Sequence, residues 1–165
     1  MVAKKNPMVR ILMAGLVVVA IAAGVTWAQV PHAHGEHEGH ASSGEKPVLD
    51  HGKKWKTDAP LRKGMEAIRA DLVAALPAIH EKRYTPPEYA ALAGKIDAQI
   101  SSMVANCKLP KDADAQLHLV LAELLAGSRA MKEKTGQRAG SIQVLGALGT
   151  YGSYFDHAGW KPIEH

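Results

Sequence analysis

Cysteine and aromatic residues are scarce in this sequence. Its 165 residues include one cysteine, Cys107, and one phenylalanine, and aromatic residues make up only 5% of the chain. A single cysteine excludes an internal disulfide. Strands are not indicated either, because no stretch shows the alternation of β-branched and polar residues that half-buried strands have. The alanine- and leucine-rich remainder predicts an all-α fold with one domain.

Dense positive charge is also missing from the part of the chain expected to fold. The formal net charge is +4, and setting aside Lys4, Lys5 and Arg10 near the start leaves about +1 for the rest. A nucleic-acid partner needs a concentrated basic face, so this class of partner is excluded. Because the sequence has no nucleophile elbow, phosphate-binding loop or metalloprotease helix motif, we expect no enzymatic activity.

Residues 1–28 have the pattern of a secretory signal peptide. A basic start is followed by an apolar run from Ile11 to Val25 and by small residues near Ala28. We therefore expect export to a periplasmic compartment, with cleavage after Ala28. An uncleaved anchor is the alternative, because 11–27 is close to the shortest stretch that spans a bilayer. Membrane attachment is expected only in that case.

Histidines gather directly after this leader. His32, His34, His37 and His40 lie close together with two glutamates, in a segment rich in glycine and serine. Imidazole and carboxylate ligands suit copper, zinc or nickel, and a flexible tract can fold around an ion without a preformed cavity. We expect a flexible His-rich linker over 29–57 that captures copper or zinc. A solvated linker with incidental histidines is the alternative.

Four amphipathic segments follow between residues 58 and 157. The second opens with a capping box at Thr85 and Glu88, with proline at the first helical position. The third starts near Asp112, and the fourth covers about 141–155. Short connections between such helices predict an antiparallel up-down-up-down four-helix bundle, followed by a C-terminal tail over 158–165. The stripe of the first helix is Leu61, Met65, Ile68, Leu72, Leu76 and Ile79.

Glycines recur at every third position of the fourth helix, at Gly146, Gly149 and Gly152. Each glycine costs a helix about 1 kcal/mol relative to alanine. Such a stripe lets another helix or a flat ligand approach the backbone closely. One hypothesis is therefore a metal-free bundle that binds a partner through this glycine face.

The expected topology brings four possible metal ligands to one pole of the bundle. They are Met65, Cys107, His118 and His157, from four different helices. A thioether, a thiol and two imidazoles suit copper or haem iron. Each residue also has a purely structural interpretation. Met65 would then be a core methionine and Cys107 a small buried hydrophobic residue. His118 would lie at the boundary of the core, and His157 would cap the C-terminus of the fourth helix.

The first helix resembles that of the cytochrome b562 family of soluble periplasmic b-type cytochromes. The shared pattern is Leu61, Met65, Glu66, Ile68, Asp71 and Leu72. The resemblance covers about 58–157, with motif-level similarity at the two ends. It implies haem b with Met65 and His157 as axial ligands, and electron transfer with a periplasmic redox protein. Covalently attached haem is excluded, because no Cys-x-x-Cys-His motif is present.

The position of His157 sets a condition on this assignment. On an ideal fourth helix, His157 points about 160° away from the apolar face, so it faces inward only if the helix ends near Asp156. The leading prediction is an exported metal-binding bundle, with haem placed ahead of copper or zinc. The alternatives are metal handling through the His-rich tract, with a metal-transfer protein as partner, and the metal-free bundle.

Overall fold

The computed structural model describes residues 45–164. They form four helices and two strands of two residues each, so the prediction of an all-α unit with four helices is confirmed. The expected leader and the four histidines His32, His34, His37 and His40 lie outside the described residues. The elements are β1 (Trp55–Lys56), α1 (Ala59–His80), α2 (Pro86–Asn106), α3 (Lys111–Lys132), α4 (Gln137–Tyr154) and β2 (Phe155–Asp156).

Local capping chemistry fixes where the helices begin. Asp58 caps α1, its Oδ1 accepting a hydrogen bond of 2.9 Å from the Leu61 amide. Glu88 Oε2 accepts from the amide and the hydroxyl of Thr85, both at 2.7 Å, which confirms the capping box of α2. The helix α4 starts after Gly136, whose φ of 87° lies in the left-handed region that favours glycine. This start is four residues earlier than the sequence predicted.

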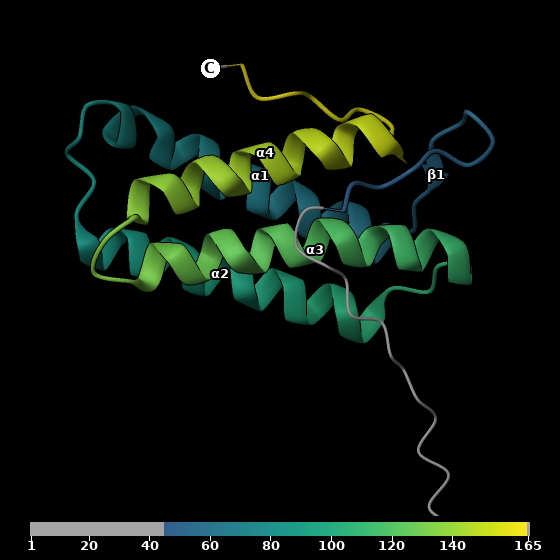
Figure 1. The fold of residues 1–165 in the computed structure, drawn as a ribbon, viewed down its shortest axis with the longest axis horizontal. Coiled ribbons are helices and arrows are strands. Elements are labelled where there is room, and N and C mark those ends of the chain that lie inside the picture. Colours follow the sequence, from purple (N-terminus) through teal and green to yellow (C-terminus); the bar gives the residue numbers. More distant parts are fainter. Residues whose placement is uncertain (1–44, 165) are drawn as a thin grey trace, which may run out of the picture. The chain divides into compact units, whose positions relative to one another are not determined.

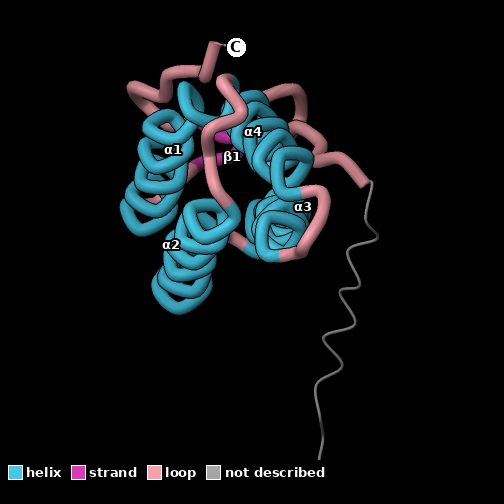
Figure 2. The backbone as a smooth tube through the Cα atoms, turned by 90° about the vertical axis from the view of Figure 1, so that its left-hand side faces the viewer, coloured by secondary structure: helices cyan, strands magenta, loops and turns pink. Residues whose placement is uncertain are grey.

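The apolar stripes of the four helices meet in one core. Figures 1 and 2 show the helices arranged around a common centre, with consecutive helices side by side. The stripe predicted for the first helix is buried, except that Leu76 is partly exposed. Fully buried members of the core include Leu61, Met65, Ile68, Ile96, Leu124 and Tyr151.

The helices α3 and α4 touch backbone to backbone at two glycines. A Cβ atom added to Gly127 would lie 2.7 Å from the Gly140 carbonyl oxygen, and one added to Gly140 would lie 2.5 Å from the Gly127 carbonyl oxygen. Only glycine permits this approach. The contacts between α1 and α4 are far fewer than those between α3 and α4. The tight crossing of α3 and α4 is thus accompanied by a looser seam between α1 and α4.

The chain beyond α4 pairs with the chain before α1. The strands β1 and β2 are parallel, with Trp55 opposite Phe155 and Lys56 opposite Asp156. Thr57 Oγ1 also donates to the Asp156 carbonyl oxygen at 2.7 Å. This pairing replaces the helical conformation after Tyr154, so α4 ends there.

The segment expected to be flexible over 29–57 is ordered in its last part. The Val48 amide donates to Gln116 Oε1 of α3 at 2.8 Å, and Trp55 Nε1 donates to the Val48 carbonyl at 2.6 Å. Trp55 is partly buried against the core. These hydrogen bonds and the Trp55 contact hold residues 48–57 on the bundle.

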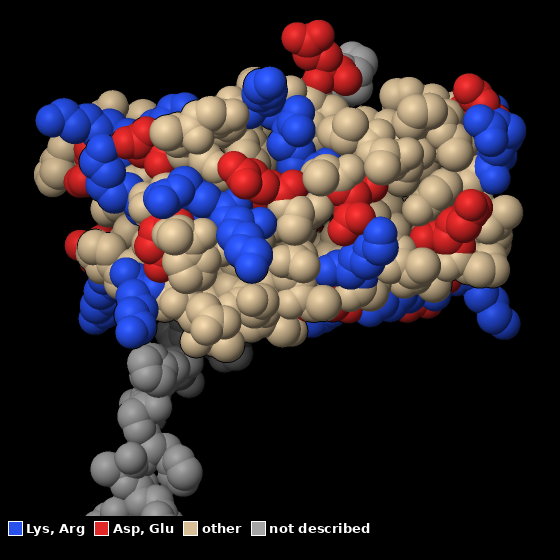
Figure 3. All heavy atoms as spheres, turned by 180° about the vertical axis from the view of Figure 1, so that it is seen from behind, with Lys and Arg blue, Asp and Glu red and all other residues tan. Residues whose placement is uncertain are grey.

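The outer surface of the described part is mixed in charge. Figure 3 shows basic and acidic side chains interspersed on the face opposite that of Figure 1. Within residues 45–164, no helix combines the length and the apolar composition needed to cross a bilayer.

Candidate functional site

His157 lies inside the protein, at one end of the seam between α1 and α4. Because α4 stops at Tyr154, the chain turns and brings His157 inward, as the sequence required, and the residue is 7% exposed. Its Nδ1 lies 2.9 Å from Tyr151 Oη, and its Nε2 lies 2.9 Å from Glu66 Oε1. A carboxylate only accepts, so Nε2 donates to Glu66. Burial raises the pKa of Tyr151, which keeps the phenol protonated and able to donate to Nδ1.

This arrangement does not fit the axial haem pair that the family resemblance implies. An axial histidine presents one ring nitrogen to the iron, whereas both nitrogens of His157 are hydrogen-bonded to protein groups. Met65 is 0% exposed and is part of the packed core. The His157 ring contacts Glu66, the residue that follows Met65 on α1. Because successive helical residues point about 100° apart, the Met65 side chain points in a different direction from that of Glu66. As arranged here, Met65 and His157 do not form an open axial site.

Cys107 connects the end of α2 to the start of α1 through a side-chain hydrogen bond. Its thiol is hydrogen-bonded to the side chain of Asp58, and Asp58 Oδ2 accepts from the Lys108 amide at 2.6 Å. Burial first, and then the nearby Asp58 carboxylate, raise the pKa of Cys107 to about 12. A thiol that remains protonated is a poor nucleophile and a poor metal ligand. Asp58 thus caps α1, as Thr57 or Asp58 was expected to do, and also fixes the end of α2, a second role that the sequence did not indicate.

His118 lies on the exposed side of α3. Its Nδ1 is 2.9 Å from the Asp114 carbonyl oxygen, one turn earlier, and 3.4 Å from Asp114 Oδ2. Among residues 45–164, no three histidine, cysteine, aspartate or glutamate side chains are grouped closely enough to hold a metal ion. Cys107, His118 and His157 each bond to different protein groups in the structure, and the copper site expected at this pole stays a prediction.

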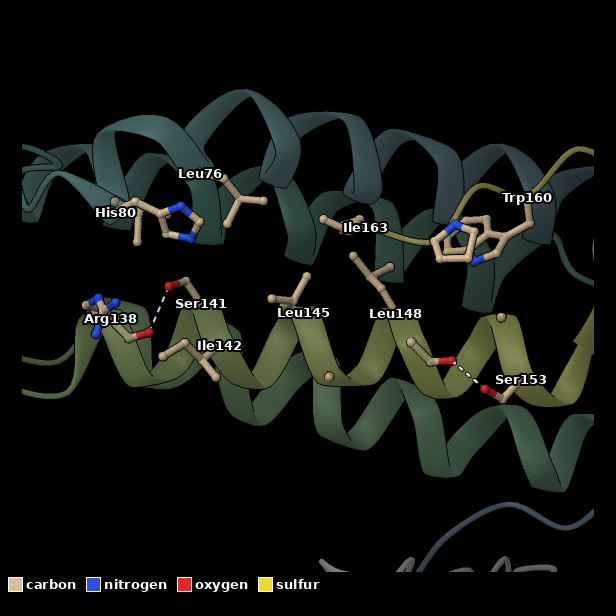
Figure 4. Close-up of a pocket in the computed structure, with 15 residues that line it drawn as sticks. Leu76, His80, Arg138, Ser141, Ile142, Leu145, Leu148, Ser153, Trp160 and Ile163 are labelled. Atoms are coloured by element: carbon tan, nitrogen blue, oxygen red, sulfur yellow. Dashed lines mark hydrogen bonds between the residues drawn. The ribbon is translucent and has the colours of Figure 1, made fainter. Parts of the chain in front are cut away.

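A larger feature is an apolar groove of about 610 Å³ along the loose seam between α1 and α4. Figure 4 shows Leu76 on α1 facing Leu145 and Leu148 on α4 across it, with Ile163 of the C-terminal segment over its middle. We call this feature the α1–α4 groove. Its lining is Leu76, Ile79, His80, Arg138, Ser141, Ile142, Leu145, Gly146, Leu148, Gly149, Gly152, Ser153, Trp160, Pro162 and Ile163.

The glycine face of α4 forms the floor of this groove. The Trp160 indole lies directly over Gly152, where an added Cβ would collide with it. The close approach that the glycine pattern predicted is thus made at Gly152 by the chain's own tryptophan. At Gly146 and Gly149 an added Cβ would meet no atom within 4 Å. The backbone at these two positions is open to the groove.

Trp160 lines one end of the groove and packs against Tyr151 and His157. The Trp160 ring centroid lies 4.8 Å from that of Tyr151 and 5.2 Å from that of His157. Arg69 Nε donates to the Lys161 carbonyl oxygen at 2.6 Å, which holds the following segment on α1. His157 is therefore a positioning residue for this wall. The one sequence feature that could have indicated this wall is the position of Trp160 directly after a helix with a glycine stripe.

The opposite end of the groove carries its polar groups. Figure 4 shows His80, Arg138 and Ser141 together where α1 ends and α4 begins. Among the described residues, no aspartate or glutamate lines the groove. Its two serine hydroxyls are already used within α4, Ser141 donating to the Arg138 carbonyl oxygen at 2.8 Å and Ser153 to the Gly149 carbonyl oxygen at 3.0 Å.

Comparison with family models, with curated proteins and with solved structures finds no match for this chain. The resemblance to the cytochrome b562 family stays a prediction made from the sequence.

Proposed function

We propose that this protein is an exported binding module that holds an elongated apolar small molecule in the α1–α4 groove. The observation that carries the proposal is the pair of uncovered glycines, Gly146 and Gly149, in the floor of an apolar groove of about 610 Å³. That volume lies within the range of small-molecule sites, about 300 to 1,000 Å³. The proposal develops the metal-free hypothesis, in which the glycine face makes the contact.

The energetics of the glycines support this function. Glycine in a helix interior costs about 1 kcal/mol relative to alanine, and tight packing can offset that cost. Gly127, Gly140 and Gly152 each have a neighbour that occupies the space of a missing Cβ. Gly146 and Gly149 have none. A ligand lying on them would supply the missing van der Waals contacts and remove apolar surface from water.

The proposal explains the loose seam between α1 and α4 by the order in which the helices are connected. In an antiparallel up-down-up-down bundle the first and last helices are neighbours without a direct connection, and they can separate while consecutive pairs remain packed. The close contact of Gly127 with Gly140 holds α4 on α3. Ligand sites between the helices of a bundle are a common arrangement.

Binding of a neutral apolar dye, N-phenylnaphthylamine, tests the proposal. We expect the dye to fluoresce on binding the full chain and Gly149→Leu to abolish that signal, because an added Cβ at this position meets no atom within 4 Å and the leucine side chain takes up space in the groove. Gly94→Leu is the matched control: Gly94 is an exposed glycine within α2 that also has open space around it, and it lies outside the groove. Equal dye binding by both variants, or no binding by the parent protein, would refute the proposal.

A further inference from the structure

We infer that the ligand of the α1–α4 groove is a single-chain amphiphile with an anionic head, as in a long-chain carboxylate, and that Arg138 and His80 hold the head. This inference rests on the proposed function and adds the chemical class of the ligand. Its basis is the distribution of charge along the groove.

The charged residues that line the groove in the described part of the chain are all basic. Among the described lining residues, Arg138 is the one that is permanently charged, and His80 beside it offers an imidazole. Within residues 45–164, no carboxylate side chain lines the groove to neutralise them. Both residues are exposed, so a head group placed there keeps part of its hydration. An anion is therefore favoured at this end and a cation is disfavoured.

Three of the five arginines in the described residues have a hydrogen-bond partner for the guanidinium group. Arg62 donates to the Thr57 carbonyl, Arg69 to the Lys161 carbonyl, and Arg83 to Glu81. Within residues 45–164, no hydrogen bond or ion pair of the structure uses the Arg138 guanidinium. The guanidinium group is planar and carries several N–H donors, so it matches a carboxylate in geometry as well as in charge.

The remainder of the groove suits an apolar chain and fixes its direction. The lining part of α4 runs from Arg138 to Ser153, which is about 22 Å along the helix axis. Between these ends the hydroxyls of Ser141 and Ser153 are bonded to carbonyls of their own helix, leaving mainly apolar side chains and open glycine backbone to meet the ligand. Trp160 stands over Gly152 near the far end. The head consequently lies at Arg138 and the chain extends toward Trp160.

The test compares two surfactants with the same chain and opposite charge, dodecanoate and dodecyltrimethylammonium, titrated below micelle formation into the full chain. We expect dodecanoate to bind at least about threefold more tightly, the magnitude of an exposed ion pair. Arg138→Gln should remove this preference while leaving N-phenylnaphthylamine binding intact. Arg129→Gln, an exposed arginine of α3 outside the groove, is the matched control and should retain the preference.

The outcomes separate this inference from the proposed function. Equal affinity for the two surfactants, or a preference that survives Arg138→Gln, overturns the anionic-head inference while the dye result stands. Failure of both surfactants and the dye to bind overturns the proposed function as well. A dimer in sedimentation that excludes the dye and is not dispersed by dodecanoate would assign the groove to a second copy of the chain, and would also overturn the inference.

Discussion

The imidazole of His157 donates to Glu66 across 2.9 Å, although 91 residues separate the two in the chain. The histidine side chain is 1% exposed and the glutamate side chain is 64% exposed, so the bond runs from the interior to the surface. It ties the segment after α4 to α1 and thereby sets the position of Trp160, one wall of the groove. The residue that the family resemblance assigns to haem iron thus has a structural partner at each ring nitrogen.

Removing the His157 imidazole should destabilise the protein. His157→Leu leaves the Tyr151 hydroxyl buried without its partner and releases Glu66, so we expect the free energy of unfolding to fall by about 1–3 kcal/mol. Urea denaturation followed by tryptophan fluorescence measures this change. Glu66→Gln is the control, since its amide oxygen can still accept from His157, and it should cost much less. Equal stability of the parent and His157→Leu would contradict the role given to this hydrogen-bond chain.

Met65 should contribute to stability and should have no effect on haem binding. Because its side chain is enclosed in the core, Met65→Ala is expected to lower the free energy of unfolding by about 2–5 kcal/mol. Absorption spectra recorded during haemin titration of the parent and of Met65→Ala should be alike. A Soret band that is present in the parent, and lost in both Met65→Ala and His157→Ala while circular dichroism remains unchanged, would restore the axial pair.

The thiol of Cys107 should react slowly with iodoacetamide in the folded protein. Its pKa of about 12, raised from an ordinary value of 9.0, keeps it protonated through neutral and mildly alkaline pH. The unfolded-state thiol ionises at lower pH than the folded one, so its contribution to stability is complete below 9.0 and is lost as the pH rises toward about 12. Asp58→Asn keeps a good helix cap and removes the negative charge beside the thiol. We therefore expect the pH dependence of the Cys107 alkylation rate to shift to lower pH in this variant. An unchanged profile would contradict this coupling.

Capture of copper or zinc remains a prediction for the His-rich tract. Elemental analysis of the full chain and of a variant lacking residues 29–45 should show a loss of bound metal in the variant, because His32, His34, His37 and His40 supply the imidazoles. His118→Ala is the control within the bundle and should leave the metal content unchanged, since its ring is not part of a group of ligands in the described residues. Equal metal content with and without the tract would reject a capture role.

The local sequence determined much of the architecture of this protein. The 3.6-residue periodicity specified four helices and their buried stripes, and the pairing of Thr85 with Glu88 specified where α2 begins. The glycine pattern of α4 correctly indicated a close approach to the backbone, which Trp160 makes at Gly152. These features are local because each depends on residues within a turn or two of one another.

Only the tertiary structure decided which of the candidate ligands meet and where a binding site lies. Pairing of β1 with β2 ends α4 and turns His157 toward Glu66, and a contact between segments so far apart in the chain leaves no local pattern. The crossing at Gly127 and Gly140 depends on two helices at once, so neither glycine is conspicuous alone. The sequence identified the side chains and the helices that carry them. Packing, which brings distant surfaces together and leaves α1 apart from α4, decided what those side chains contact.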